Sequence, residues 1–443
     1  MGLRRYIKSM KLSKYNHFFC PYDQSESLLI NYSTGRLHIF AEQADQDIRE
    51  YFNSHKTSKN IEAFLVNKGY LIEDEVDEEY NIQLIESEIR EQKDVLSLVF
   101  ILTERCNLRC VYCCEEHLNT RMTQDLQDKI IEFVKQNIHK YKLLKVEWFG
   151  GEPLLCMDII EYMSKKFLKI CHENNVRYFA VTSTNGYLLN LANLKKLKDL
   201  HVFAYQITVD GLRKTHDAQR MRSDGVGSWD IIVQNLKEIR DHFNSNLVSF
   251  LIRTNVTYPI YNEIDEYMKF LSDEFGNDKR FSFIWRIAED WGRIEEKDMK
   301  ILCGIEEYRN VMKKAGHMKL RNRYLAGTLK PGERACEAAK KNSLIFFPTG
   351  IIGKCERNVE PEKSHIGNID ELLKFPEKYL NRTLTRNKEG AKSCKHCEKY
   401  AICLGKACPF IEDVQCGYEM KDIDFLLDCI MKCDDTCSRI TRF

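Results

Sequence analysis

Three cysteines lie close together, directly after a long apolar run. The run 95–102 predicts a buried strand, and Cys106, Cys110 and Cys113 follow it in a C-x3-C-x2-C spacing. A [4Fe–4S] cubane normally takes four thiolates, so a loop with three cysteines leaves one iron open. An open metal position is where a metal site does chemistry. Structural zinc loops use paired C-x2-C or Cys/His sets instead, so the pattern favours an iron–sulfur cluster.

In its setting TERCNLRCVYC, this spacing resembles the signature of the radical S-adenosylmethionine (radical SAM) enzymes. The resemblance implies that the open iron binds the amino and carboxylate groups of SAM. It also implies that electron transfer cleaves SAM to a 5′-deoxyadenosyl radical. Cys114 adjoins Cys113, so the two side chains point apart, and we expect Cys114 to be a spare thiol.

Composition limits the classes of partner. The chain has 443 residues, 18 cysteines and a net charge of +1, which gives no strong field for nucleic acid or an anionic membrane. No apolar run approaches the ~20 residues that span a bilayer. Residues 1–19 are basic but lack the apolar core of a secretory signal. Cysteines without an export signal favour metal over disulfides, so we expect a cytoplasmic protein.

Strand and helix patterns alternate from residue 95 to about residue 289. Strands are expected at 95–102, 144–149, 178–183, 203–209, 248–255 and 281–286. Helices are expected at 123–139, 158–174, 191–198, 229–243 and 264–275. Such βα units predict an α/β fold with a parallel sheet and right-handed crossovers. The radical SAM resemblance implies a partial (β/α)6 barrel, open on one side.

A glycine-rich turn follows the second expected strand. Gly150, Gly151, Glu152 and Pro153 form a GGEP motif, in which two glycines let the backbone approach a ligand closely. The resemblance implies that Gly150, Gly151 and Glu152 bind the amino group of SAM. It also places Tyr112, on the cysteine loop, against the adenine, with core packing as the equal alternative.

Later strand ends carry further polar residues, which face the catalytic edge of such a barrel. Ser183 and Asn185, in a STNG turn, and Asp210, in a DG turn, resemble the turns near the SAM ribose. Arg220, in an H-x3-R stretch, resembles the arginine that pairs with the SAM carboxylate, with a surface salt bridge as the alternative. Asn255 is expected to contact the adenosine, at even odds.

The cysteines from Cys336 onward resemble the SPASM domain, which carries two auxiliary [4Fe–4S] clusters, so the resemblance implies three [4Fe–4S] clusters in all. The inner spacing C-x2-C-x5-C-x4-C is one residue longer than the family pattern, which puts Cys408 in doubt. The resemblance implies two ligand sets, namely Cys394, Cys397 and Cys403 with a later cysteine, and Cys336, Cys355 and Cys408.

The later cysteine is expected to be Cys416, because the stretch 418–431 reads as a helix that would carry the chain away. Cys429, Cys433 and Cys437 remain alternatives. Whether the cluster of Cys336, Cys355 and Cys408 has an open iron is not determined by the sequence.

The N-terminal stretch shows three short strands followed by two helices. Strands are expected at 17–20, 28–32 and 36–40, and helices at 43–52 and 58–68. Before a radical SAM core, this order resembles the winged-helix RiPP recognition element, which takes a leader peptide as an added strand. An acidic linker or exposed helix follows. The expected domains are 1–85, this element; 86–300, the barrel; 301–330, a bridge; and 331–443, the SPASM domain with a terminal helix.

Together these resemblances predict a radical SAM peptide maturase. Its partners would be a precursor peptide with a leader and a low-potential electron donor such as flavodoxin or ferredoxin, with neither nucleic acid nor a membrane. The product would be a crosslinked peptide, with a thioether favoured over a carbon–carbon bond because an open auxiliary iron would favour thiolate. A formylglycine-forming, anaerobic sulfatase-maturating enzyme and a non-catalytic iron–sulfur carrier are the alternatives. The sequence does not identify a catalytic side chain.

Overall fold

The computed structural model describes residues 9–21, 26–54, 59–290, 294–318, 320–322, 329–332, 335–356, 361–384, 394, 397–404, 423–432 and 441–442. The chain divides into two compact units. The first unit combines residues 1–90, 323–336 and 385–443, and the second combines 91–322 and 337–384. No helix within the described ranges is long and apolar enough to cross a lipid bilayer.

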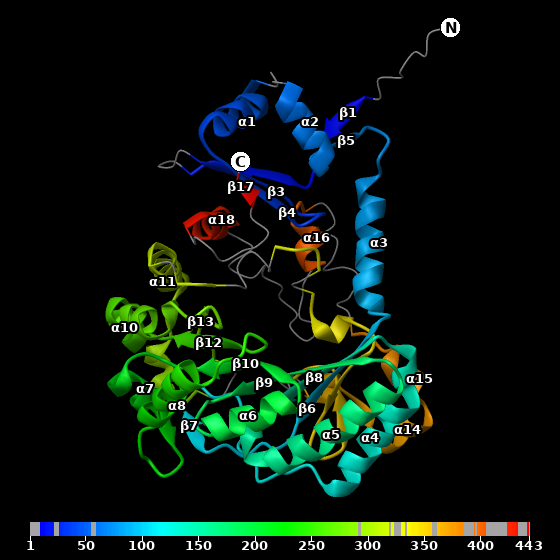
Figure 1. The fold of residues 1–443 in the computed structure, drawn as a ribbon, viewed down its shortest axis with the longest axis vertical. Helices are drawn as coiled ribbons and strands as arrows, with labels where there is room; N and C mark the ends of the chain where they lie inside the picture. Colours follow the sequence, from blue (N-terminus) through cyan, green and yellow to red (C-terminus); the bar gives the residue numbers. More distant parts are fainter. Residues whose placement is uncertain are drawn as a thin grey trace. The chain divides into compact units, whose positions relative to one another are not determined.

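Six parallel strands form the centre of the second unit (Figure 1). They are β6 (Val95–Ile101), β8 (Leu143–Phe149), β9 (Arg177–Thr184), β10 (Val202–Thr208), β12 (Ser249–Val256) and β13 (Phe281–Ile287). They neighbour one another in chain order, and every pairing among them is parallel. The predicted α/β class and the βα order of the radical SAM fold are therefore confirmed.

Helices connect these strands and cover one face of the sheet. They are α4 (Gln124–Asn137), α5 (Met157–Glu173), α6 (Leu191–Asp199), α7 (Arg213–Gln219), α8 (Trp229–His242), α9 (Tyr258–Asn262), α10 (Ile264–Leu271) and α11 (Ile305–His317). In β8, Val146 and Trp148 are fully buried, whereas Glu147 and Phe149 are partly exposed. Because side chains alternate along a strand, Glu147 lies on the opposite face from Trp148.

An aromatic cluster packs the sheet against the helices. The ring centroid of Phe100 lies 5.2 Å from that of Trp148, 5.8 Å from that of Phe167 and 5.2 Å from that of Phe346. All four side chains are completely buried. Large buried rings of this kind contribute much of the stability of a core.

Three further strands extend the sheet beyond β6 and were not predicted from the sequence. β14 (Ser343–Phe346) pairs in parallel with β6, and β15 (Ile351–Gly353) and β16 (His365–Asn368) add antiparallel neighbours. The short helices α13 (Pro361–Ser364), α14 (Ile369–Lys374) and α15 (Pro376–Leu380) flank them. Residues 337–384 thus belong to the second unit, and the four-domain division expected from the sequence stays a prediction.

The first unit contains a four-stranded sheet in the order β17-β4-β3-β2. Its strands are β2 (Asn16–Phe19), β3 (Ser27–Asn31), β4 (Arg36–Phe40) and β17 (Thr441–Arg442), with β1 (Met10–Leu12) and β5 (Leu71–Glu73) as a separate pair. Helices α1 (Glu42–Ser54) and α2 (Lys59–Lys68) follow the strands as predicted. The winged-helix assignment itself stays a prediction.

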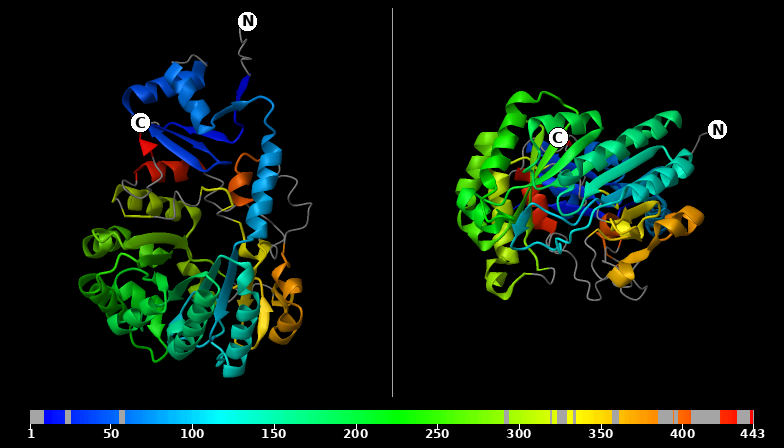
Figure 2. Two further views of the ribbon diagram at one scale, coloured as in Figure 1. Left: turned by 45° about the vertical axis from the view of Figure 1, so that its right-hand side comes forward. Right: turned by 90° about the horizontal axis from the view of Figure 1, so that it is seen from below.

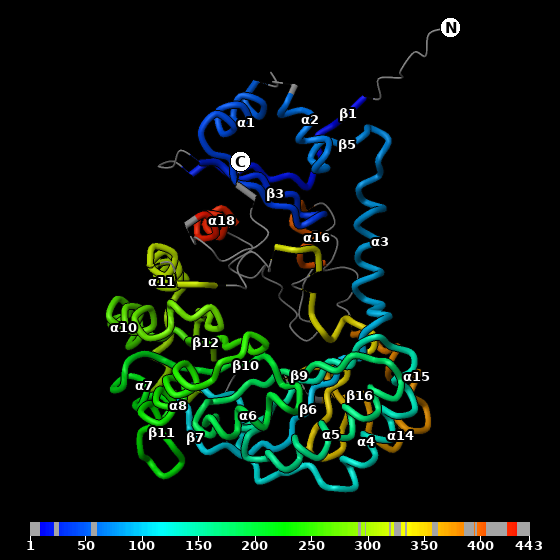
Figure 3. The backbone as a smooth tube through the Cα atoms, viewed as in Figure 1, coloured from blue at the N-terminus to red at the C-terminus, as the bar shows by residue number. Residues whose placement is uncertain are grey.

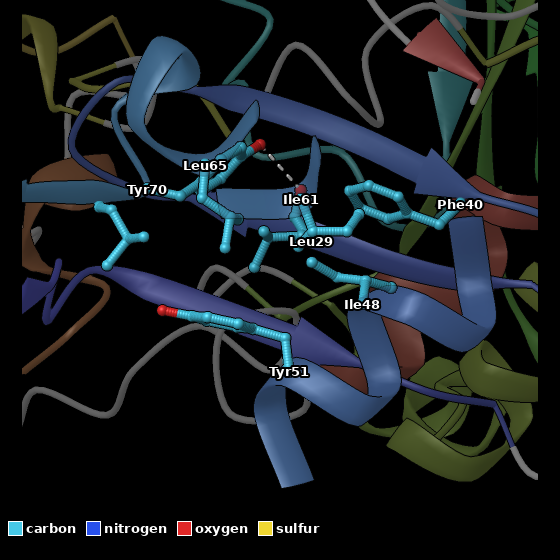
Figure 4. Close-up of a cluster of buried hydrophobic side chains, with 8 residues drawn as sticks. Leu29, Phe40, Ile48, Tyr51, Ile61, Leu65 and Tyr70 are labelled. Atoms are coloured by element: carbon cyan, nitrogen blue, oxygen red, sulfur yellow. Dashed lines mark hydrogen bonds between the residues drawn. The ribbon is translucent and has the colours of Figure 1, made fainter. Parts of the chain in front are cut away.

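A small core joins the strands and helices of the first unit. Figure 4 shows Leu29, Phe40, Ile48, Leu65 and Tyr70 packed together, and Tyr70 Oη donates a hydrogen bond of 3.1 Å to the carbonyl of Leu29. These side chains come from β3, β4, α1, α2 and the turn before β5. The core therefore links four of the predicted elements of this stretch, and Phe18 of β2 packs against it.

Segments from both ends of the sequence meet within the first unit (Figures 2 and 3). The acidic stretch forms α3 (Glu78–Glu91), and Tyr400 Oη of α16 (Tyr400–Cys403) donates a hydrogen bond of 2.8 Å to Glu86. His17 Nε2 lies 2.6 Å from Asp424 Oδ1 of α18 (Ile423–Lys432). Helices α16 and α18 of the C-terminal stretch thus contact the N-terminal stretch within the first unit.

Replacing Phe100 with Ala is expected to lower the free energy of unfolding of the second unit by about 3–5 kcal/mol, because it empties the centre of the aromatic cluster. Urea denaturation of the full chain would measure this loss. The matched control is Phe375→Ala, at a side chain that is 60% exposed, which should change stability by no more than about 0.5 kcal/mol. Equal losses in the two variants would contradict the proposed packing.

Candidate active site

The cysteine loop leaves the carboxyl end of β6 and is tied down by a short ladder. β7 (Leu108–Cys110) pairs antiparallel with β11 (Arg220–Arg222), which sets Cys110 opposite Arg220. The N–H of Cys113 donates a hydrogen bond of 3.1 Å to the carbonyl of Cys110. Cys106, Cys110 and Cys113 therefore lie on one compact loop at the edge where the parallel strands end.

The thiols of this loop are largely shielded from water. Burial raises the pKa of Cys106 to about 12 and that of Cys113 to about 12. Backbone N–H groups of Leu108 and Glu115 point at the Cys106 and Cys113 sulfurs, each at 3.4 Å. Such thiols stay protonated at neutral pH unless a metal cation stabilises the thiolate, so the donor set suits iron.

No three Cys, His, Asp or Glu side chains in the described part of the chain are arranged to hold one metal ion. A cubane spreads its cysteine ligands over different irons, so its ligands need not converge on a single point.

The GGEP turn packs directly beneath the backbone of the cysteine loop. A Cβ on Gly150 would lie 2.3 Å from the carbonyl oxygen of Thr103, and one on Gly151 would lie 2.4 Å from that of Arg105. Gly151 N–H and Glu152 N–H donate to these same two oxygens, each at 2.9 Å. Glycine is required here because only a bare backbone fits against the loop. Contact of this turn with the SAM amino group stays a prediction.

Glu152 is fully buried and braces the next turn. Its Oε1 accepts hydrogen bonds from Leu154 N–H at 3.0 Å and Thr184 Oγ1 at 2.7 Å, and its Oε2 accepts from Asn185 N–H at 2.8 Å. Burial raises the pKa of Glu152, and these donors oppose the rise. Both carboxyl oxygens thus have partners within the protein, so the side chain acts here as a structural brace.

Asn185 links Glu152 to the cysteine loop. Its Nδ2 donates a hydrogen bond of 2.8 Å to Asn107 Oδ1 and lies 3.7 Å from Cys106 Sγ. A donor aimed at a ligating sulfur is one of the features that tune the potential of an iron–sulfur cluster. Asn107 was not singled out in the sequence, because only the folded chain brings it to Asn185.

Four other predicted SAM contacts form one hydrogen-bonded network. Tyr112 Oη donates to Asp210 and accepts from Arg220 Nη1 at 2.8 Å. Asn255 donates through its backbone N–H to Asp210 Oδ1 at 2.7 Å and through Nδ2 to Tyr112 Oη at 3.3 Å. The tertiary structure thus unites residues that are up to 143 positions apart.

Arg220 is the charged centre of this network. It is 6% exposed, and its Nη1 lies 3.5 Å from Oδ2 of the fully buried Asp210. Burial raises the pKa of Asp210, whereas the guanidinium opposes the rise. Among the described residues, the buried Nε of Arg220 finds no hydrogen-bond acceptor. A buried N–H without an acceptor is costly, so this site suits an anionic group such as the carboxylate of SAM.

Ser183 belongs to a different set of contacts. Its Oγ donates to Glu147 Oε1 at 3.3 Å and accepts from Gln206 Nε2 at 3.4 Å. Sequence reasoning did not single out Glu147 and Gln206. The alternation of apolar and polar residues along 143–149 was the available signal, because it places Glu147 away from the buried Val146 and Trp148.

The auxiliary cysteines are described only in part. In the first unit, Cys394 and Cys397 form a turn in which Cys397 N–H donates to the Cys394 carbonyl at 3.0 Å, and Cys403 ends α16. Cys336 belongs to the first unit and Cys355 to the second. Cys429 is buried in α18. Four predicted or alternative ligands lie outside the described residues, namely Cys408, Cys416, Cys433 and Cys437. The auxiliary ligand sets stay predictions.

Replacing Gly151 with Ala is expected to displace the cysteine loop, because the added methyl group meets three loop atoms at 2.4–2.8 Å. Overpacking of this kind costs about 1–3 kcal/mol. The midpoint temperature of thermal denaturation and the iron content per chain after reconstitution should both fall. Gly276→Ala is the control, since its Cβ would meet only the Ser272 side chain, with Oγ at 3.3 Å and Cβ at 3.8 Å. Wild-type iron content in the Gly151 variant would show that the turn does not support the loop.

Replacing Asp210 with Asn leaves the Arg220 guanidinium buried without its counter-charge. We expect a loss of about 3–5 kcal/mol in the free energy of unfolding, measured with urea. The matched control is Asp230→Asn, which breaks the ion pair with Arg213. The side chain of Asp230 is 57% exposed and that of Arg213 is 64% exposed. That change should cost less than about 1 kcal/mol. A loss as small as that of the control would refute a structural role for the buried pair.

Comparison with known proteins places this site in a family. Residues 100–271 match the sequence model of the radical SAM superfamily. An uncharacterized protein of Methanocaldococcus jannaschii is 26% identical over 289 residues, covering 63% of this chain and 90% of that protein. Fe-coproporphyrin III synthase of Methanosarcina barkeri is 26% identical over 144 residues, and this chain spans only 34% of its length.

A solved structure of native anSMEcpe with bound AdoMet and Kp18Cys peptide has a similar fold, with a TM-score of 0.60 and 18% identity. The match covers 76% of this chain and 97% of that one. The cysteine loop, the glycine turn beneath it and the match over residues 100–271 agree with one another. Residues 100–271 of this chain therefore form a radical SAM domain.

Proposed function

We propose that this enzyme uses SAM and a [4Fe–4S] cluster on Cys106, Cys110 and Cys113 to modify a ribosomally made precursor peptide. One observation supports the SAM site. The buried Nε–H of Arg220, which lies opposite Cys110 in the β7–β11 ladder, has no hydrogen-bond acceptor among the described residues. SAM bound at such a cluster supplies, after one-electron reduction, a carbon radical that abstracts hydrogen atoms.

The residues of the chain position SAM rather than react with it. Arg220 would hold the carboxylate of SAM through Nε, because Tyr112 and Asp210 already fix the other end of its fork. Asn255 holds Asp210 and Tyr112 in place, so the guanidinium cannot swing away. A fixed, buried cation of this kind binds one anionic group in one orientation.

The peptide substrate is supported by the likeness of fold to anSMEcpe, whose structure contains a bound peptide. In the first unit, the strand order of residues 16–40 provides the kind of sheet edge to which a leader peptide could add. Auxiliary [4Fe–4S] clusters on the C-terminal cysteines would receive the electron released from the substrate. A flavodoxin or ferredoxin would supply the reducing electron.

The bond formed is proposed to be a crosslink, with a thioether ahead of a carbon–carbon bond. The competing activity is formylglycine formation on a cysteine peptide. Two peptides separate these possibilities, namely a synthetic precursor peptide, made from the short reading frame that we expect beside the gene, and Kp18Cys. Each would be incubated with reduced enzyme and SAM and then analysed by mass spectrometry. A crosslink removes two hydrogens from the first peptide, and a thioether also removes one alkylatable thiol. Conversion of the Kp18Cys cysteine to an aldehyde would favour the competing activity.

Removing Cys106, Cys110 and Cys113 together, each to Ala, should abolish cleavage of SAM to 5′-deoxyadenosine. Iron per chain should fall by roughly a third if three similar clusters are present. Chromatography of the nucleoside and an iron assay would measure the two losses. Cys114→Ala is the matched control on the same loop and should keep both iron and cleavage. Cleavage that persists in the triple variant would refute the assignment of the cluster.

A further inference from the structure

A row of polar side chains crosses three neighbouring strands on the face of the sheet that the helices leave open. Gln206 of β10 donates to Ser183 of β9 at 3.4 Å, and Ser183 donates to Glu147 of β8 at 3.3 Å. The flanking residues of β8, Val146 and Trp148, are fully buried on the other face. The predicted SAM contacts leave Glu147 and Gln206 without a role.

The polar row lies on strands whose carboxyl ends lead into turns that carry predicted SAM contacts. Ser183 is two positions before Asn185, which follows the end of β9 and contacts Asn107 and Cys106. Glu147 is three positions before Gly150, whose turn supports the cysteine loop. A substrate that reaches the radical from the open face of the sheet would therefore meet this row.

The surroundings of Glu147 favour a carboxyl that exchanges a proton near neutral pH. Burial raises its pKa to about 7, and the negative charges of Glu356 and Glu337 add to the rise. Lys145, on the same strand, and the hydrogen bond from Ser183 act in the opposite direction. A general base works best when its pKa is near the working pH.

We propose that Glu147 accepts the proton that the peptide substrate releases when the new bond forms, and that Ser183 and Gln206 are positioning residues. The proposal deepens the proposed function and rests on it. One substrate C–H bond gives its hydrogen atom to the carbon radical supplied by SAM. The second substrate group loses its proton to the Glu147 carboxylate as the crosslink forms, and the remaining electron passes to an auxiliary [4Fe–4S] cluster. The peptide thus loses two hydrogens, and no further oxidant is needed.

The test compares Glu147→Gln with the wild-type enzyme on the synthetic precursor peptide described above. The measured quantities are the rate of crosslinking and the crosslinked peptide formed per 5′-deoxyadenosine. We expect Glu147→Gln to lower the crosslinking rate about 100-fold or more, because glutamine cannot take up a proton. The wild-type rate should rise as the pH increases through about 7, since the carboxylate is the active form. This rise should be absent from Glu147→Gln.

Three further measurements sharpen the result. Glu161→Gln, at a surface carboxylate of α5 paired with Lys165, is the matched control and should keep the wild-type rate and pH profile. Ser183→Ala should move the midpoint of the profile to higher pH, because its hydrogen bond stabilises the carboxylate. Infrared spectra of enzyme labelled with ¹³C-glutamate, minus those of Glu147→Gln, should show one carboxyl that titrates near pH 7 without peptide.

The outcomes that overturn the proposal are distinct. A wild-type pH profile in Glu147→Gln would exclude the carboxyl as proton acceptor. A rise in KM with kcat unchanged would make Glu147 a binding contact instead. If the wild-type enzyme modifies neither the precursor peptide nor Kp18Cys, the proposed function itself fails, and the role of Glu147 fails with it.

Discussion

The site depends on the contact between a glycine turn and the backbone of the cysteine loop. Gly150 and Gly151 approach the carbonyl oxygens of residues 103–105 so closely that no side chain fits between them. The N–H groups of Gly151 and Glu152 then hydrogen-bond to the loop, so its carbonyls are satisfied away from water. The loop that carries the three thiols is thereby fixed to the end of β8, and the pocket around it is built on a rigid support.

A second constraint is the burial of charge beside that loop. Arg220 and Asp210 are both removed from water, and such a pair is weak evidence for stability because desolvation offsets much of the attraction. Its value here lies in orientation. Tyr112 and Asn255 complete the network, and the buried Nε of Arg220 has no acceptor within the described part of the chain. Burial of the Arg220–Asp210 pair costs stability but holds the guanidinium in one orientation, as expected of a binding site.

The two faces of the second unit's sheet carry different kinds of side chain. Large apolar and aromatic side chains such as Trp148 and Phe100 hold the helices on one face. Partly exposed polar side chains such as Glu147 and Ser183 occupy the other face. Because side chains alternate along a strand, one strand contributes apolar side chains to the core and polar side chains to the opposite face.

Much of this protein could be predicted from the sequence alone. The C-x3-C-x2-C spacing and the βα alternation identified the cysteine loop and the parallel sheet, because both signals are local. The GGEP turn was found, but the sequence did not show that Gly151 packs against the cysteine loop. Local patterns also missed the added strand β14 and the partnership of Glu147 with Ser183 and Gln206, since these contacts join distant parts of the chain. Only the tertiary structure decided which polar residues share a face, because that depends on strand order and register.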